Sequence, residues 1–258
     1  MSDSKRSTTV KSLARGLDLL TMIAEADKPL GITDLSRKMG LAKGSVSRIV
    51  TTLVQQKFVT RDPESARYRA GIRLWELGLK SLEGLRFREV ARPVMEAING
   101  RTREGVHISV LNENNQMVFI DQIESTRTLR PFVRLGSLHP PYCVAMGKAL
   151  LSVMSREELN QILPSELVSY TKNTITDKDA LFDQLQAARK RGYATNHGEY
   201  RVDLSGIAAP IFDHLSKAVG TIGIVLASDR LTEGLEKKYG KILSSGAMEI
   251  SLALGWRP

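Results

Sequence analysis

Small polar and basic side chains gather on one face of a helix that the sequence predicts from Lys43 to Gln56. The apolar residues of this helix follow the i, i+3, i+4, i+7 spacing of a buried face: Val46, Ile49, Val50 and Leu53. The opposite face carries Lys43, Ser45, Ser47, Arg48, Thr51 and Thr52. Basic side chains can donate to guanine and hydroxyls can pair with bases or phosphates, so this face suits the major groove of DNA. The first residues of such helices touch base edges, which places nearest the bases Lys43, Ser45, Ser47 and Arg48. The alternative is the solvated face of an ordinary helical domain.

A second group of residues that could bind a ligand or take part in catalysis lies in two predicted loops of the C-terminal half. Residues 136–148 form a long loop that enters a helix, whose free N–H groups around Ala145 to Gly147 would attract a carboxylate or phosphate. The second loop is formed by residues 195–199, with Asp203 close behind, and it could form another wall of the same site. No nucleophile with its base is specified by the spacing of His139, Cys143, His197 and Asp203. These loops therefore favour a ligand pocket over an active site, and the protein is not expected to be an enzyme.

Two more helices would position the DNA-reading helix. Thr33 is the expected N-cap of a short helix in which Leu35 and Met39 share a buried face. Gly40 suits the left-handed turn that follows, so residues 33–56 are predicted to form a helix-turn-helix. An earlier helix over residues 10–26 supplies the third packing layer. Its apolar face is predicted at Val10, Leu13, Leu17, Leu20 and Ala24, widened by Leu19, Met22 and Ile23. Basic residues at its start, including Arg15, are expected to add phosphate contacts.

A β-hairpin is predicted directly after the reading helix. Residues 57–61 and 67–70 are β-prone, and the Asp-Pro-Glu-Ser-Ala stretch between them favours a turn. A hairpin in this place is the wing of a winged helix, and it would carry Arg61, Arg67 and Arg69 toward phosphates or the minor groove. The alternative is a surface hairpin whose arginines only keep it soluble.

Charge is unevenly distributed along the 258 residues. Residues 1–89 hold 17 Lys or Arg and 10 Asp or Glu, an excess of seven positive charges, whereas the remaining residues have an excess of two. This is the electrostatic pattern of a DNA-binding module joined to a nearly neutral domain. A single cysteine excludes an internal disulfide framework, and with four scattered histidines it does not resemble a zinc site. No apolar run approaches the length of a membrane span, so we expect a cytoplasmic protein without metal, cofactor or membrane partner.

The next segment predicts a linker helix that starts at Ile72 and ends before Pro93. Trp75 extends an apolar stripe formed by Leu74, Leu77, Leu82 and Leu85. Such a stripe often packs against its twin in a dimer, although it could pack on its own domain instead. A two-fold dimer would present two reading helices to DNA half-sites about 34 Å apart.

From about residue 91 the pattern changes to mixed helices and strands. Residues 105–111 and 117–123 predict an antiparallel hairpin, and Leu129 to Leu135 a third strand. Helices are predicted over 145–154, 156–163, 177–191 with Thr176 as N-cap, and 232–254. Further strands are predicted near 193–195, 206–211 and 219–227. The order favours an α+β domain in which helices cover an antiparallel-leaning sheet.

Several separated motifs in this order resemble the IclR-type transcriptional regulators over residues 10–256. The motifs are the reading helix, residues 61–68, the linker start at 74–78, and residues 145–151, 189–194 and 206–211. The resemblance implies a GAF-like effector domain, dimers often paired into tetramers, and a small metabolite, commonly an organic acid, that alters DNA binding.

Carried over by position, the family pocket implies a contact set at Leu129, Pro131, Ala145, Met146, Asn196, Leu204, Gly206, Gly223 and Val225. Where some relatives present cysteine or serine near the acid, this chain has Gly206, Gly223 and Val225, and the loop's usual glutamate pair is reduced to Gly198-Glu199. The wall is therefore less polar, which favours a larger, partly apolar or aromatic acid. Polar contacts could come from three residues that are otherwise surface or structural groups: Arg134, His139 and Tyr142.

Together the sequence predicts a winged helix-turn-helix DNA-binding domain at 1–71, a linker helix at 72–90, and a GAF-like effector-binding and oligomerisation domain at 91–258. We expect a transcriptional regulator, acting as repressor or activator or both. A small organic acid would control its binding to double-stranded operator DNA as a homodimer or a dimer of dimers. The alternative is a constitutive DNA-binding regulator whose second domain only oligomerises.

Overall fold

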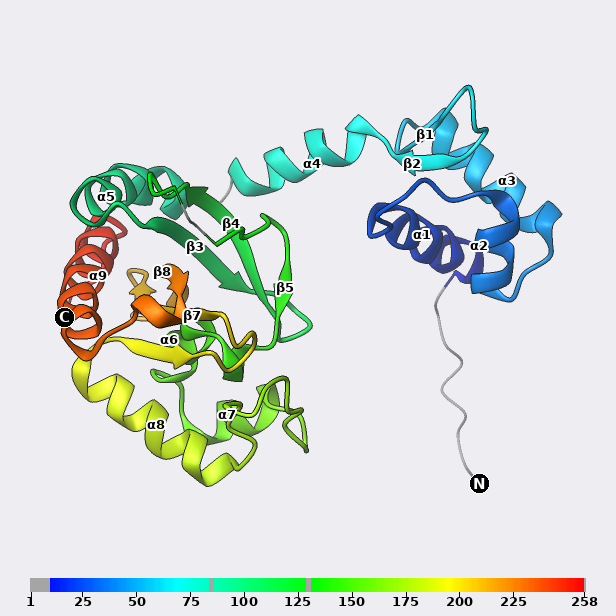
Figure 1. The fold of residues 1–258 in the computed structure, drawn as a ribbon. Coiled ribbons are helices and arrows are strands. Elements are labelled where there is room, and N and C mark those ends of the chain that lie inside the picture. The colour runs from blue at the N-terminus through cyan, green and yellow to red at the C-terminus, as the bar shows by residue number, and fades with distance from the viewer. Residues whose placement is uncertain (1–9, 84–85, 129–130, 258) are drawn as a thin grey trace. The chain divides into compact units, whose positions relative to one another are not determined.

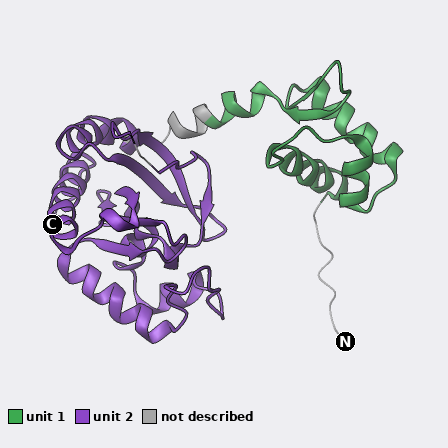
Figure 2. Ribbon diagram, viewed as in Figure 1, with its two compact units in different colours: residues 1–84 green, residues 85–258 purple. Residues whose placement is uncertain are grey.

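The computed structural model describes residues 10–83, 86–128 and 131–257. For residues 79–83 and 86 it describes the backbone only. The chain divides into two compact units, residues 1–84 and residues 85–258 (Figure 2). Each unit has a hydrophobic core of its own. In the described residues, no helix combines the length and the apolar composition needed to cross a membrane.

The first unit is a three-helix core followed by a two-stranded hairpin and a fourth helix (Figure 1). Its helices are α1 (Lys11–Ala24), α2 (Ile32–Met39), α3 (Lys43–Gln55) and α4 (Ile72–Glu83). Strands β1 (Val59–Arg61) and β2 (Tyr68–Ala70) pair antiparallel, and a bridge from Leu30 to Tyr68 joins the hairpin to the helices. The core contains Leu19, Leu20, Ile23, Leu35, Val46, Val50 and Val59. This is the predicted winged helix-turn-helix.

Local chain signals fixed most but not all helix ends in this unit. Gly40 ends α2 in the left-handed conformation (φ 63°), as predicted. The predicted N-cap Thr33 is wrong: α2 begins at Ile32, and the Asp34 carboxylate accepts from the Gly31 N–H at 3.2 Å. An acidic side chain at this place satisfies a free N–H of the first turn and opposes the positive end of the helix dipole.

The predicted buried face of α1 is also wrong in part. The helix buries Leu19, Leu20 and Ile23, whereas Val10, Leu13 and Leu17 are more than half exposed. Apolar residues occur on more than one side of this helix, so periodicity alone could not select the side that faces α2 and α3.

The predicted linker helix is two helices in the structure. After α4, helix α5 runs over Arg86–Thr102 and contains Pro93, which was expected to end the linker. Proline cannot donate to the carbonyl four residues before it, but the helix persists because Phe87, Ala91, Val94, Met95 and Ile98 are buried in the core of the second unit. Residues 86–90 therefore belong to this helix of the second unit rather than to the linker.

The second unit is built on a six-stranded antiparallel sheet with the order β5-β4-β3-β8-β7-β6 (Figure 1). The strands are β3 (Gly105–Leu111), β4 (Met117–Ile123), β5 (Leu138–His139), β6 (Ala194–His197), β7 (Leu204–Phe212) and β8 (Ala218–Ala227). Helices α5 and α9 (Glu233–Ala253) pack on one face, against Val106, Ile108, Ile207, Ile222 and Ile224. Helix α6 (Ala145–Leu151) packs on the opposite face, near Met117, Phe119 and Ala208. The predicted α+β class with an antiparallel sheet is confirmed.

Three smaller features differ from prediction. Residues 131–135 are not a strand, and Leu138 and His139 instead pair with β4. Helices α7 (Arg156–Ile162) and α8 (Lys178–Arg191) occur as expected, but the cap of α8 is Asp177, whose carboxylate accepts from Ala180 N–H at 2.8 Å, rather than Thr176. A bulge between β3 and β4 pairs Ile108 with Asp121 but Ser109 with Phe119. This bulge determines which side chains of β4 face α6.

Candidate nucleic-acid interface and ligand cavity

Helix α3 presents a polar face opposite its buried valines. Val46 and Val50 are buried and point into the trihelical core. At 100° per residue, the side opposite them is centred on Gly44, Arg48 and Thr51. Five predicted DNA-contacting residues are exposed, namely Lys43, Ser47, Arg48, Thr51 and Thr52, whereas Ser45 is half-buried at the flank. Gly44 adds no side chain to this face, so a partner can approach the backbone closely.

The hairpin after α3 carries its three arginines in different ways. Arg61 pairs with Tyr68 across the strands and Arg69 pairs with Thr60, so these two arginines lie on opposite faces of the hairpin. The Arg67 guanidinium donates to the Pro29 carbonyl at 3.1 Å and lies 3.4 Å from the Asp34 carboxylate. Arg67 therefore braces the hairpin against α2, while its side chain stays 50% exposed. Contact with DNA by Arg61, Arg67 and Arg69 stays a prediction.

Two other features complete this unit. Asp62 shapes the hairpin turn, because its carboxylate accepts from the Ser65 N–H at 2.8 Å and the Ser65 hydroxyl at 2.9 Å, which lowers the Asp62 pKa. Arg15 is exposed on α1, where a phosphate can reach it. The unit thus exposes a helix and a hairpin that are both basic.

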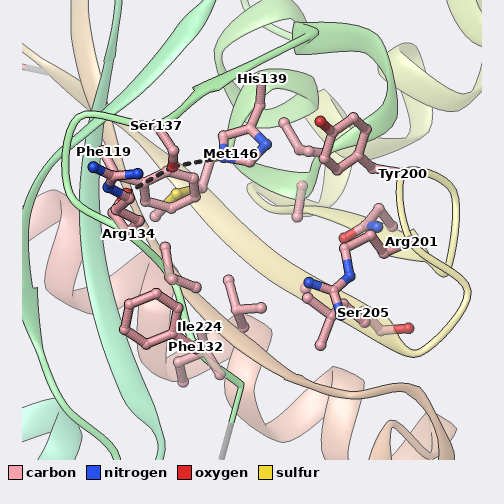
Figure 3. Close-up of a pocket in the computed structure, with 17 residues that line it drawn as sticks. Phe119, Phe132, Arg134, Ser137, His139, Met146, Tyr200, Arg201, Ser205 and Ile224 are labelled. Atoms are coloured by element: carbon pink, nitrogen blue, oxygen red, sulfur yellow. Dashed lines mark hydrogen bonds between the residues drawn. The ribbon is translucent and has the colours of Figure 1, made fainter. Parts of the chain in front are cut away.

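The second unit contains a cavity of about 210 Å³ between the sheet and the loops before α6 and β7; we call it the main cavity (Figure 3). Gly206 of β7 lies in its floor: a Cβ there would lie 3.0 Å from Asn196 Oδ1 and 3.2 Å from the Ala145 Cβ. Its apolar walls come from Phe119, Phe132, Val133, Val144, Ala145, Met146, Leu204, Ile224 and Val225. Its polar groups come from Arg134, Ser137, His139, Asn196, Tyr200, Arg201 and Ser205.

The two arginines at the main cavity differ in their surroundings. The Arg201 guanidinium forms a two-pronged pair with Asp203, at 3.2 and 2.8 Å. Arg134 is exposed and has no ion pair with any carboxylate among the residues that the structure describes. A carboxylate ligand can therefore pair with Arg134 without displacing a partner, whereas Arg201 would have to share its guanidinium.

His139 is the most buried titratable group of the main cavity. Its Nε2 lies 2.8 Å from the Ser137 hydroxyl, and its Nδ1 has no hydrogen-bond partner in the described part of the protein. Burial lowers the His139 pKa, so the ring is neutral near pH 7. Its edge-to-face contacts with Phe119 (5.2 Å) and Tyr200 (5.1 Å) fix the orientation of the ring. This nitrogen is itself buried, so His139 lines the cavity without exposing Nδ1 to it.

Eight of the twelve residues predicted to bind the effector line the main cavity in the structure: Arg134, His139, Ala145, Met146, Asn196, Leu204, Gly206 and Val225. Pro131 instead lines a neighbouring cavity. Tyr142 was wrongly placed: it is buried and donates to the Val168 carbonyl at 3.0 Å. Gly223 lies under Met146, whose Cε would be 3.1 Å from an added Cβ, and does not reach the cavity. Leu129 lies outside the described residues.

Sequence reasoning missed nine lining residues: Phe119, Phe132, Val133, Ser137, Val144, Tyr200, Arg201, Ser205 and Ile224. Ser205 and Val144 adjoin residues that were predicted, so they could have been added by proximity. Phe119 required the pairing of β4, and Tyr200 and Arg201 required the course of the loop after β6.

A buried ion pair supports the cavity from behind. Lys148 of α6 is 1% exposed and bonds to the Glu199 carboxylate and to Gln184 Oε1, the latter at 2.6 Å. Thr174 Oγ1 donates to the Glu199 carbonyl at 2.6 Å. This network holds the loop whose next residues, Tyr200 and Arg201, line the main cavity. Of the residues whose spacing specified no nucleophile with its base, Cys143 is buried and burial raises its thiol pKa to about 12, while His197 pairs with Glu236 at 3.1 Å.

Comparisons with known proteins cover both units of the chain. Residues 79–252 match the family described as "Bacterial transcriptional regulator IclR C-terminal", and residues 12–63 match the "IclR helix-turn-helix domain". The chain belongs to the IclR family. It is 30% identical to the HTH-type transcriptional regulator KdgR of Escherichia coli, over 98% of this chain and 95% of KdgR. It is 29% identical to the transcriptional repressor IclR of Escherichia coli, over 95% of this chain and 90% of that protein.

Solved IclR structures share the fold. The Thermotoga maritima IclR structure has a TM-score of 0.77 and 29% identity, covering 95% of this chain and 99% of that one. An IclR homologue of Microbacterium hydrocarbonoxydans complexed with 4-hydroxybenzoate has a TM-score of 0.81 and 26% identity, covering 94% and 98%. Members of the family are transcriptional regulators that bind DNA through a helix-turn-helix, and this protein is therefore a regulator rather than an enzyme.

Proposed function

We propose that this IclR-family protein releases or binds its operator in response to an organic acid held in the main cavity. The observation that supports this most is that an apolar cavity is lined by an arginine without an ion-pair partner among the described residues. Phe119, Phe132 and Met146 offer an apolar or aromatic surface, and Arg134 has no ion pair among the described residues. An acid with a flat apolar body matches this combination.

The related structure with bound 4-hydroxybenzoate supports the same ligand class, because that ligand is an aromatic monocarboxylate. Neutral His139 adds an uncharged ring to the wall of this cavity. We therefore propose that Arg134, His139 and Asn196 orient the ligand, while Met146 and Gly206 shape its apolar surroundings.

DNA reading is proposed for α3 and the hairpin. Arg48 and Thr51, at the centre of the exposed face, would reach bases in the major groove, and Lys43, Ser45, Ser47 and Thr52 would surround them. Arg15, Arg61 and Arg69 would contact the backbone. Arg67 would act through the hairpin that it braces.

We propose a homodimer as the DNA-binding form, with a dimer of dimers as a further assembly. Trp75 on α4 is 62% exposed, and Ile72 beside it is equally open, as are Val10, Leu13 and Leu17 on α1. Apolar surface of this extent on a small unit favours association with a second copy. Two copies would present two reading helices to a pseudo-palindromic operator.

Thermal unfolding with a panel of aromatic monocarboxylates, including 4-hydroxybenzoate, tests the ligand proposal. A ligand present at a hundred times its Kd stabilises the protein by about 2.7 kcal/mol, which is readily measured. At least one acid should raise the Tm of the wild type and should do so less for Arg134→Gln. A matched control is Arg101→Gln, an exposed arginine on α5, whose response should equal that of the wild type. No stabilisation by any acid would favour a constitutive regulator whose second unit only oligomerises.

A further inference from the structure

Beside the main cavity lies a second cavity of about 220 Å³, which we call the side cavity. It opens on the same face of the sheet, and Phe132, Val133 and Val225 line both cavities. The residues that line the side cavity alone are Gly105, His107, Gln122, Glu124, Ser125 and Pro131.

The strand register places the two cavities side by side. Val225 of β8 pairs with Gly105 of β3 on one side and with Gly206 of β7 on the other. Gly105 lies in the side cavity, Gly206 in the main cavity, and Val225 between them. Two strand spacings separate the glycines, which is roughly 10 Å. The main cavity and the side cavity are therefore neighbours on one face of the sheet.

His107 is the buried polar group of the side cavity. The residue is almost fully buried, and its Nδ1 has no hydrogen-bond partner among the described residues. Its Nε2 faces the space above Gly105, where an added Cβ would lie only 3.1 Å away. A glycine at this position therefore makes room for the imidazole ring, which packs over it. An edge-to-face contact with Phe119, at 5.5 Å, holds the ring in place.

The charges of the side cavity select an uncharged ligand group. Burial keeps the His107 imidazole neutral, so it can offer one donor and one acceptor but no positive charge. Gln122 lies opposite His107 in the β3–β4 register and adds an amide, which is also uncharged. A hydroxyl or carbonyl group suits this imidazole and amide. The bulge in β4 makes this possible, because it lets Phe119 and Gln122, three residues apart, face the same side.

We infer that the effector is an elongated organic acid whose uncharged hydrogen-bonding end enters the side cavity and bonds to His107, while its acid group stays in the main cavity. His107 is then a specificity-determining residue. This inference rests on the proposed function, since it defines the far end of the same ligand.

A matched pair of acids tests the inference. The probes are 4-hydroxycinnamate, which carries a carboxylate and a hydroxyl at opposite ends, and cinnamate, which lacks the hydroxyl. Calorimetric titration of the full-length wild type should show about tenfold tighter binding of 4-hydroxycinnamate, the effect of one neutral hydrogen bond. His107→Leu should abolish this preference without changing the affinity for cinnamate. His107→Gln, which keeps a donor and an acceptor, should restore part of it and guards against a folding defect in the leucine variant.

The outcomes separate the inference from the proposed function. Equal binding of the two acids by the wild type, or an unchanged preference in His107→Leu, would overturn the role of His107 and leave the main-cavity proposal standing. Failure of every aromatic monocarboxylate to bind would overturn both. A crystal structure with the bound hydroxyl within hydrogen-bond distance of a His107 nitrogen would support the inference directly.

Discussion

The buried Lys148–Glu199 pair gives the sharpest stability prediction. In Lys148→Met the side chain keeps its length but loses its charge, and the Glu199 carboxylate remains buried. Among the described residues, only the His197 N–H, at 3.4 Å, then donates to this carboxylate. Removing one partner of a buried pair costs about 3–5 kcal/mol. For a domain of about 170 residues each kcal/mol lowers Tm by roughly 2–4 °C, so the second unit should lose on the order of 6–20 °C.

Differential scanning calorimetry of the full chain measures this change. The double variant Lys148→Met/Glu199→Gln, which removes both charges, should regain much of the loss because no uncompensated carboxylate remains. The control is Lys237→Met, since Lys237 pairs with Glu233 at 2.6 Å on the exposed surface of α9 and should leave Tm unchanged. An equal Tm in Lys148→Met and Lys237→Met would refute the role assigned to the buried pair.

Three further predictions follow from single side chains. Arg48→Ala should weaken operator binding by about 1–3 kcal/mol and change base preference, whereas Arg69→Ala should weaken binding to all sequences and reduce the salt slope by ~0.9, both read by fluorescence anisotropy. Cys143 should resist iodoacetamide at pH 8 in the folded protein and react after unfolding, because burial raises its pKa to about 12. Burial lowers the His107 pKa from 6.5 to about 4, so the unfolded chain takes up this proton first and stability is lost as the pH falls from 6.5 toward 4. Between pH 7 and pH 4.5, the free energy of unfolding measured with urea should therefore fall by roughly 2–3 kcal/mol less for His107→Gln than for the wild type. An equal fall in both proteins would contradict the burial of His107.

Local sequence signals predicted the winged helix-turn-helix well. The turn at Gly40, the apolar spacing of α3 and the Asp-Pro-Glu-Ser-Ala turn each depend on a few neighbouring residues, and the structure has all three. The bonds that Arg67 makes within the domain were not predicted, because its partners are distant in sequence: Pro29 and Asp34 lie 38 and 33 residues away. Exposure of a charged side chain was predictable, but its bonding within the domain was not.

The main cavity was predictable only where residues matched a family motif or lay beside one. The side cavity was not predicted at all, because it depends on long-range strand pairing. Gly105 and Val225 are neighbours through the β3–β8 register, and no local pattern brings them together. The alternating pattern of residues 105–111 predicts a strand that contains His107. It does not indicate that the Nδ1 atom of this ring is buried without a partner among the residues that the structure describes.

Control of DNA binding by an acid is the central claim, and an operator-binding titration tests it most directly. A duplex selected from random DNA by the full-length protein would be labelled, and its anisotropy followed while the best-binding acid of the aromatic panel is added. A ligand shifts this equilibrium only by its difference in affinity between the DNA-bound and free forms. The account predicts a change in operator affinity for the wild type and Arg101→Gln, and a much smaller one for Arg134→Gln. An acid that binds the protein but leaves operator affinity unchanged in all three would contradict it.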